Sequence, residues 1–241
     1  LYNNINNNKG IIKMKKIITI IALMALSTVS AKAIDLPDLG FFSLTAGVGS
    51  NTSVWGASGK EQNFDNANAT IVETNSAEGV FTESYSSQMI ELGLGKYVSI
   101  GRETMDDLTT PTNIANEGRD AEISVAVKFK DVESTYIKLN IPGGLFLKFA
   151  DMTTKLDIVE SRGDYGTPSL DGSSIGAGYE RLFGDSGFGM RLEGTYHEFD
   201  NVKVTDDEVN ATGNGKNVVT ATNIEGLSAK VALTYTLGRN Y

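Results

Sequence analysis

Residues 188–200 read Phe-Gly-Met-Arg-Leu-Glu-Gly-Thr-Tyr-His-Glu-Phe-Asp, a stretch in which apolar and polar side chains alternate. Alternation with a period of two predicts a β-strand that presents different chemistry on its two faces. The polar side carries Arg191 and Glu193, and the apolar side carries Met190 and Leu192. A soluble protein would bury the apolar side, whereas a barrel in a membrane would turn it outward to lipid. The remainder of the chain has to decide between these two arrangements.

The composition fits one mid-sized domain. The chain has 241 residues, of which 40% are hydrophobic and 21% charged. It contains no cysteine, so it offers neither a disulfide nor a thiolate metal site. The formal net charge of −9 argues against a nucleic-acid-binding surface.

The N-terminal region has the pattern of an export signal. Residues 14–33 contain a basic start, a short apolar run and small residues up to Ala33. This order predicts a secretory signal peptide that is cleaved after Ala33. We interpret residues 1–13 as an unstructured upstream extension and residues 34–241 as the folded domain. Removal of residues 1–33 takes away five lysines and no acid, which leaves 30 acidic and 16 basic side chains and a net charge of −14.

The rest of the chain predicts an all-β protein. Alternating segments are separated by stretches rich in Gly, Asn, Asp, Ser and Thr. No later stretch approaches the ~18 consecutive apolar residues of a transmembrane helix. We expect eight strands, at residues 42–57, 82–94, 98–103, 121–141, 145–150, 175–180, 188–200 and 230–237.

The predicted connections alternate strictly in length. Three are short turns, near Gly95, Gly143 and Gly184. Four are long polar loops, at residues 58–79, 106–120, 160–172 and 204–223. A soluble sandwich has no reason to keep all its long loops at one end, whereas barrels of the bacterial outer membrane have short periplasmic turns and long outer loops. The sequence therefore predicts an eight-stranded antiparallel up-and-down transmembrane β-barrel.

The fourth strand interrupts this pattern. In a continuous strand Asp131 and Glu133 would fall on the lipid-facing side, where charges are costly. We expect residues 135–141 to cross the membrane and residues 121–130 to extend above it. In the alternative, residues 131–134 form a turn and the barrel has ten strands.

Charged residues also occur on the predicted inner side of the strands. An eight-stranded barrel encloses a space that side chains can fill, and an unpaired charge there would be costly to desolvate. We therefore expect a lumen closed by paired charges. The expected partners are Glu91, Glu103, Glu180 and Glu193 with Lys138, Lys148, Arg191 and Lys230.

Five aromatic residues lie near predicted strand ends: Trp55, Tyr97, Tyr179, Tyr196 and Tyr235. Such positions suit an aromatic girdle at the two membrane interfaces. Tyr and Trp also favour strands in soluble proteins, so the girdle is an expectation that follows from the barrel.

Two internal runs and the C-terminal strand resemble a known family. The runs are residues 169–181, Ser-Leu-Asp-Gly-Ser-Ser-Ile-Gly-Ala-Gly-Tyr-Glu-Arg, and residues 189–196, Gly-Met-Arg-Leu-Glu-Gly-Thr-Tyr. They are similar to small outer-membrane β-barrel proteins of the OmpA transmembrane-domain and opacity-protein type, over about residues 42–241. The resemblance implies a place in the outer membrane of a Gram-negative bacterium and a C-terminal signal read by the barrel-assembly machinery. That signal would be carried by Leu233, Tyr235, Leu237 and Tyr241, although Arg239 departs from the family's pattern.

The sequence offers little chemistry for catalysis or cofactor binding. His197 is the only histidine, and strand alternation places Glu198 on the opposite face, so we interpret His197 as a lumen or interface residue and expect no enzyme. Carboxylates are left as metal ligands, and the acidic run at residues 206–208 lacks the spacing of a calcium loop. We expect no cofactor and no metal.

These observations favour a structural and surface-interaction protein of the outer membrane. Its long acidic loops would meet lipopolysaccharide, other cells or phage. One closed barrel needs no partner to satisfy its strand edges, so we expect a monomer. Two alternatives remain open: a small diffusion pore, if the interior charges leave a continuous water path, and an exported soluble β-sandwich binding protein, if the apolar faces pack inside.

Overall fold

The computed structural model describes residues 39–65, 70–110, 113–115, 123–160, 165–206 and 217–238. All described residues belong to one compact unit, Pro37–Tyr241. The predicted upstream extension and signal peptide lie outside the described residues.

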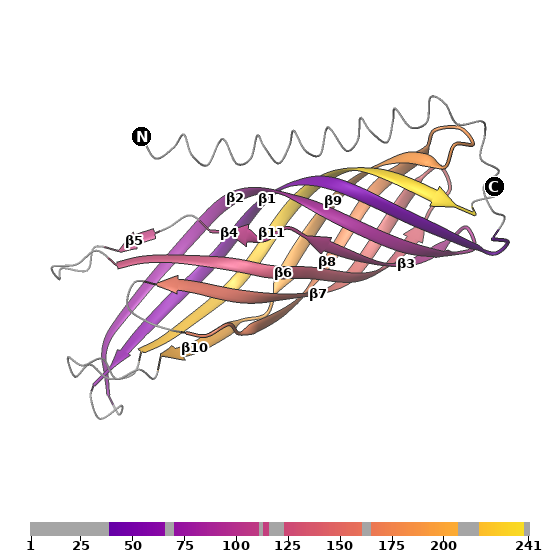
Figure 1. Ribbon diagram of the computed structural model, residues 1–241. Helices are drawn as coiled ribbons and strands as arrows, with labels where there is room; N and C mark the ends of the chain where they lie inside the picture. Colours follow the sequence, from indigo (N-terminus) through magenta and orange to yellow (C-terminus); the bar gives the residue numbers. More distant parts are fainter. Residues whose placement is uncertain are drawn as a thin grey trace, which may run out of the picture. The chain divides into compact units, whose positions relative to one another are not determined.

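The described residues form a closed antiparallel ring of eight strands (Figure 1). In ring order these are β1 (Phe42–Phe64), β2 (Ile71–Leu94), β3 (Val98–Met105), β6 (Ile123–Asn140), β7 (Leu145–Glu160), β8 (Ser169–Leu182), β9 (Phe188–Phe199) and β11 (Asn217–Leu237). Pairing of β1 with β11 closes the ring. Three short strands lie beside it: β4 (Leu108–Thr109) and β5 (Asn113–Ala115) pair with β6, and β10 (Val202–Asp206) pairs with β11. The eight-stranded antiparallel barrel predicted from the sequence is confirmed.

The register of the ring fixes the width of the barrel. Each residue of the ring has a paired residue on the next strand. From Ile100 on β3, the path of successive partners around the ring is Ile137, Phe149, Ile175, Tyr196, Leu227 and Val54, and Val54 pairs with Thr82 on β2. Ile100 also pairs directly with Leu92, so the path ends ten residues along β2 from that partner. A stagger of this kind tilts the strands, typically by about 35–45°, and an eight-stranded barrel leaves an interior that side chains can fill.

The outer wall near the short turns is apolar on every strand of the ring. One large apolar side chain from each strand illustrates this, with 38–55% of its surface exposed: Leu44, Leu92, Ile100, Ile137, Leu147, Ile175, Leu192 and Val231. An apolar band around a whole barrel is what a lipid-facing wall requires, and far exceeds the apolar patches of soluble monomers. No helix in the described part of the chain is long and apolar enough to cross a membrane.

A β-bulge in β6 shifts the alternation of inward and outward residues by one. Asp131 and Val132 together occupy the place opposite Thr154, and Asp131 has a positive φ of 51°. On the membrane side of the bulge Ile137 faces outward, whereas beyond it Phe129 is buried inside, although both residues have odd numbers. β6 is therefore one continuous strand that extends above the membrane-facing part. The ten-strand alternative, which needed a turn here, is wrong.

Several strands are longer than the sequence suggested. The predicted loop at residues 58–79 is largely strand, because β1 and β2 remain paired from Ala57 and Gly79 to Asn63 and Glu73. The other predicted loops likewise contain parts of β4, β5, β8, β10 and β11. A strand crosses a bilayer with ~9–11 residues, so β1, with 23 residues, extends well beyond it.

Candidate functional site

Eight charged side chains lie together inside the barrel, within the apolar band, and we call them the ionic layer. They are Glu91, Glu103, Lys138, Lys148, Glu180, Arg191, Glu193 and Lys230, the residues for which the sequence predicts pairing in the lumen, and each is at most 8% exposed. Every strand of the ring except β1 contributes at least one of them. The strand alternation places them here, because each lies on the inward-facing side of its strand.

Arg191 is the centre of one half of the ionic layer. Its Nη2 lies 2.7 Å from the Glu180 carboxylate and 2.9 Å from the Glu91 carboxylate. Lys138 Nζ bridges the same two carboxylates at 2.8 Å and 2.6 Å. The Tyr136 hydroxyl donates to Glu91 at 3.1 Å. Two acids and two bases leave this half without net charge, which is the condition under which buried ions are tolerated.

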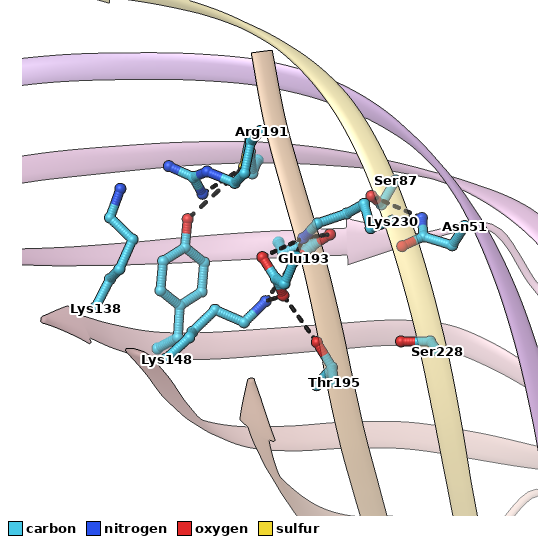
Figure 2. A network of polar contacts seen from close by, with 12 residues as sticks. Asn51, Ser87, Lys138, Lys148, Arg191, Glu193, Thr195, Ser228 and Lys230 are labelled. Atoms are coloured by element: carbon cyan, nitrogen blue, oxygen red, sulfur yellow. Dashed lines mark hydrogen bonds and ion pairs between the residues drawn. The ribbon is translucent and has the colours of Figure 1, made fainter. Parts of the chain in front are cut away.

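Glu103 and Glu193 form the other half with two lysines. Lys230 Nζ lies 2.9 Å from Glu103 and 3.0 Å from Glu193. Lys148 Nζ lies 3.2 Å from Glu103 and also pairs with Glu193. Figure 2 shows Lys148, Lys230 and Thr195 converging on Glu193, with the Thr195 hydroxyl donating to it at 2.9 Å. This half also balances two acids with two bases.

Inward glycines make room for the large side chains of the layer. Gly101 pairs directly with Tyr136 across β3 and β6, and Gly178 pairs with Phe146 across β7 and β8. A Cβ at Gly101 would lie 2.3 Å from the Tyr136 ring, and one at Gly178 would lie 2.4 Å from the Phe146 ring. The Arg191 guanidinium in turn lies over the Phe146 ring, 5.3 Å from its centroid. Because the two glycines have no side chain, the Tyr136 and Phe146 rings can pack against them and contact the charged groups.

A second group of side chains fills the lumen farther from the short turns, and we call it the apolar layer. It comprises Trp55, Tyr85, Leu108, Phe129, Val132, Met152, Leu156, Leu170, Phe199 and Ile224, each at most 7% exposed. The Trp55 ring stacks on Phe199 with centroids 5.8 Å apart. This layer is an ordinary hydrophobic core built inside the upper barrel.

The position of Trp55 corrects the predicted aromatic girdle. Trp55 points inward, because it lies two residues from the buried Ser53 on β1 and therefore shares its face. Tyr179, Tyr196 and Tyr235 share the outward parity of exposed apolar neighbours on their strands. Tyr97 lies in the turn between β2 and β3 and is 55% exposed. Four of the five predicted residues thus lie on the outside or at a turn.

His197 lies between the two layers. Its Nε2 is 2.8 Å from the Ser228 hydroxyl and its Nδ1 is 3.3 Å from Met152 Sδ, while the ring stacks on Trp55. The Nδ1 atom contacts a thioether, so the carboxylate that orients the histidine in a Ser–His–Asp arrangement is not at this position. Within the described residues, no group of three or more His, Asp or Glu side chains is arranged to hold a metal ion.

The apolar layer was not predicted from the sequence. Its signal lies in β6, where Val127 and Phe129 share the odd numbering of Ile137 but are separated from it by a charged stretch. One extra residue in that stretch reverses which residues of β6 face inward.

Of the predicted assembly signal, Leu233, Tyr235 and Leu237 share the outward side of β11, and Tyr241 lies outside the described residues.

No protein-family model matches the chain, and no curated protein matches its sequence significantly. Among solved structures, the outer membrane protein OprG of Pseudomonas aeruginosa matches with a TM-score of 0.50 at 8% identity, over 80% of this chain and 97% of OprG. Ail, the attachment invasion locus protein of Yersinia pestis, solved with the heparin analogue sucrose octasulfate, matches with a TM-score of 0.37 at 10% identity, over 79% and 99%. At such identities the likeness to OprG shows a shared fold and no more.

The closed ring, the apolar outer wall and the likeness to OprG together define the class of protein. The chain is a transmembrane β-barrel with the fold of a small outer-membrane protein. An exported soluble β-sandwich, one of the alternatives left open by the sequence, is incompatible with a closed ring whose outer wall carries an apolar band on every strand. No family assignment follows from these matches.

Proposed function

We propose that this protein is an integral protein of the Gram-negative outer membrane whose barrel is closed to diffusion and which acts at the cell surface. The barrel is the anchor, and the parts of the strands and loops beyond the bilayer make the contacts. The proposal assigns no catalytic role to the lumen.

The burial of the ionic layer is the observation that carries this proposal. Charges that line a water-filled channel are wetted, so their side chains stay accessible to solvent. Here Arg191 is 0% exposed, and Lys138 and Glu103 are each 1% exposed. The charges are compensated by one another, and the apolar layer adds a second barrier above them.

The surface role is supported by the length of the strands that extend beyond the apolar band. β1, β2 and β11 have 23, 24 and 21 residues, about twice the ~9–11 residues that a bilayer requires. After removal of the predicted signal the chain carries a net charge of −14. Acidic outer segments would meet lipopolysaccharide through bridging divalent cations, or bind other cells or phage. The closed ring is consistent with a monomer inserted by the barrel-assembly machinery.

Two measurements on residues 34–241 test the proposal. The chain is folded into detergent micelles and liposomes, and its electrophoretic mobility is compared with and without boiling. Single-channel recording follows on the folded form, with a porin of known conductance as the positive control. We expect a heat-modifiable band and no conductance. Discrete conductance steps would instead support a diffusion pore, and a chain that stays folded without detergent would contradict the membrane barrel.

A further inference from the structure

The upper half of β2 pairs with a strand on one side alone among the described residues, although β4 comes close to its other side. β2 pairs with β1 along almost its whole length, from Leu94 to Ile71. It pairs with β3 over a much shorter stretch, from Leu94 to Ser87. Within the described part of the chain, no strand pairs with residues 71–86 of β2 on this second side, and we call this side the open edge.

The end of the β2–β3 ladder shows which backbone groups point to this open edge. The Asp106 N–H donates to the Ser86 carbonyl at 2.9 Å, and the Ser86 N–H donates to the Asp106 carboxylate at 3.4 Å. Ser86 thus directs both backbone groups away from β1. Because these directions alternate along a strand, the even-numbered residues from Thr74 to Ser84 present N–H and C=O groups to the same side.

The chain that follows β3 covers a different strand. Leu108 and Thr109 of β4 pair with Phe129 and Lys128 of β6, and β5 also pairs with β6. Figure 1 shows β5 beside β6. The edge of β6 is therefore occupied, while the upper edge of β2 has no paired strand among the residues that the structure describes.

Apart from its glutamates, the open edge lacks the usual protection against strand addition. Natural edge strands carry lysine, proline or a bulge, or are covered. Residues 71–86 contain no lysine and no proline, and the β1–β2 register is unbroken from Glu73 downward. Val80 is 77% and Val72 is 64% exposed. Such a segment is well suited to accept another strand.

The charge of the edge restricts what can bind there. No Lys or Arg occurs in residues 61–95, whereas Glu73 and Glu78 lie on the open segment and are exposed. A second copy of this chain would bring the same acidic edge against itself, and like charges across paired strands are unfavourable. A strand with basic side chains would be attracted.

We propose that the open edge of β2, residues 72–84, binds an extended segment of a partner protein as an added strand, and that this segment alternates basic with β-branched residues. Main-chain hydrogen bonds to the even-numbered residues provide affinity, and Glu73 and Glu78 select basic side chains. This inference rests on the proposed surface role and supplies the chemistry of its partner.

The test uses the full folded barrel in micelles and two fluorescent twelve-residue peptides. One alternates Lys with Val and Thr, and the other has Glu in place of Lys. Fluorescence anisotropy should show the Lys peptide binding at least about tenfold more tightly, because like charges oppose the Glu peptide. Equal binding of both peptides, or binding of neither, would overturn the proposal.

Two variants at one position separate backbone from side chain. Thr82→Pro removes an N–H that points to the open edge and leaves the ladder with β1 intact, whereas Thr82→Ala keeps the N–H. Loss of one hydrogen bond should weaken Lys-peptide binding about fivefold in Thr82→Pro. Thr82→Ala should stay within about twofold, since it loses no backbone hydrogen bond. Equal effects of the two variants would contradict strand addition.

Amide hydrogen exchange on the unmodified protein provides a measurement that does not depend on either variant. The amides of Val80, Thr82 and Ser84 should exchange quickly alone and slowly with the Lys peptide, while that of Phe81, which faces β1, should be slow in both. Protection that appears without peptide and is lost on dilution would identify a second copy as the occupant and overturn the proposal. A heat-modifiable, non-conducting barrel that ignores the peptide would refute this inference and leave the proposed function standing.

Discussion

The ionic layer and the apolar layer fill one lumen with opposite chemistry. Around the ionic layer the outer wall bears Leu92, Ile137 and Leu192, so it faces hydrocarbon and the polar groups are inside. Around the apolar layer, the outer wall of β6 and β7 bears an ion pair between Lys130 and Asp157, whose side chains are partly exposed. This part of the outer wall therefore faces water, and the apolar groups are inside. The solvent outside the barrel therefore decides which residues fill it.

Two strands that pass through both layers contain a switch that reverses their inward face, whereas β7 and β9 keep one parity from Lys148 to Leu156 and from Arg191 to Phe199. In β6 the switch is the bulge at Asp131. In β11 a register shift accompanies a positive φ of 54° at Asn223. Ile224 belongs to the apolar layer and Ala221, on the other side of the shift, packs against it. The two residues are three apart, so they would face opposite sides of a regular strand. Each bulge allows one continuous strand to serve two environments.

The largest expected effect comes from breaking the ionic layer. Arg191→Met leaves Glu91 and Glu180 with Lys138 as their single cation, and removal of one partner from a buried ion network costs about 3–5 kcal/mol. Urea titration of the barrel in liposomes, followed by the heat-modifiable fraction, measures this loss.

A matched control for Arg191→Met lies on the outer wall above the bulge. Lys155→Met removes an exposed pair with Asp131, in which the side chains are 57% and 66% exposed, and should cost less than about 1 kcal/mol. The double variant Arg191→Met with Glu91→Gln restores the charge balance and should recover part of the loss. Equal destabilisation by the two single variants would mean that the ionic layer is wetted.

The second prediction concerns the space around the ions. Gly178→Ala would place a Cβ 2.2 Å from the Leu192 carbonyl and 2.4 Å from the Phe146 ring, and overpacking of this kind costs about 1–3 kcal/mol. Gly194→Ala is the control, because its nearest neighbour atom would be 4.0 Å away on the lipid-facing side. The same urea titration should separate the two variants. If both are neutral, the lumen is looser than the packing of Phe146 indicates.

The ionic layer could be predicted from the sequence, whereas the part of the apolar layer that lies above the bulge in β6 could not. Strand alternation and charge balance suffice to bring Glu91 and Arg191 to one interior, because parity is preserved within the membrane-spanning part of each strand. A bulge leaves no mark of its own: Asp131 is one of several polar residues in its stretch, and its effect on Phe129 appears once β6 is aligned with β7. Trp55 is a different case, because no bulge separates it from Ser53. The two residues share one side of β1, so the inward position of Trp55 could have been predicted from the alternation.

The third prediction tests the bulge that joins the two regions. Asp131 adopts a positive φ, which strains a β-branched side chain by about 1–2 kcal/mol and suits glycine. Asp131→Val and Asp131→Gly both lose the exposed pair with Lys155, so the difference between them isolates the backbone. Asp131→Gly should be the more stable by about that amount in the urea titration. No difference would indicate that the backbone here is extended.

The smallest expected effect sharpens the claim that water surrounds the upper wall. The hydrogen bond from Lys130 lowers the pKa of Asp157 and, reciprocally, raises the pKa of Lys130. Because the folded pKa of Asp157 is depressed, the pair's contribution to stability is present above the ordinary aspartate pKa and is lost as pH falls through the folded value. Because the folded pKa of Lys130 is raised, the same contribution is present below the ordinary lysine pKa and is lost as pH rises through the folded value.

Lys130→Met should therefore return the pKa of Asp157 towards its ordinary range, while Lys155→Met should leave it unchanged. Carboxyl carbon NMR titration in micelles measures both. Added salt should shrink the shift in the unmodified protein, because ions screen a pair that faces water. A shift that salt does not change would place Lys130 and Asp157 against lipid, and the contrast between the two regions of the outer wall would then fail at β6 and β7.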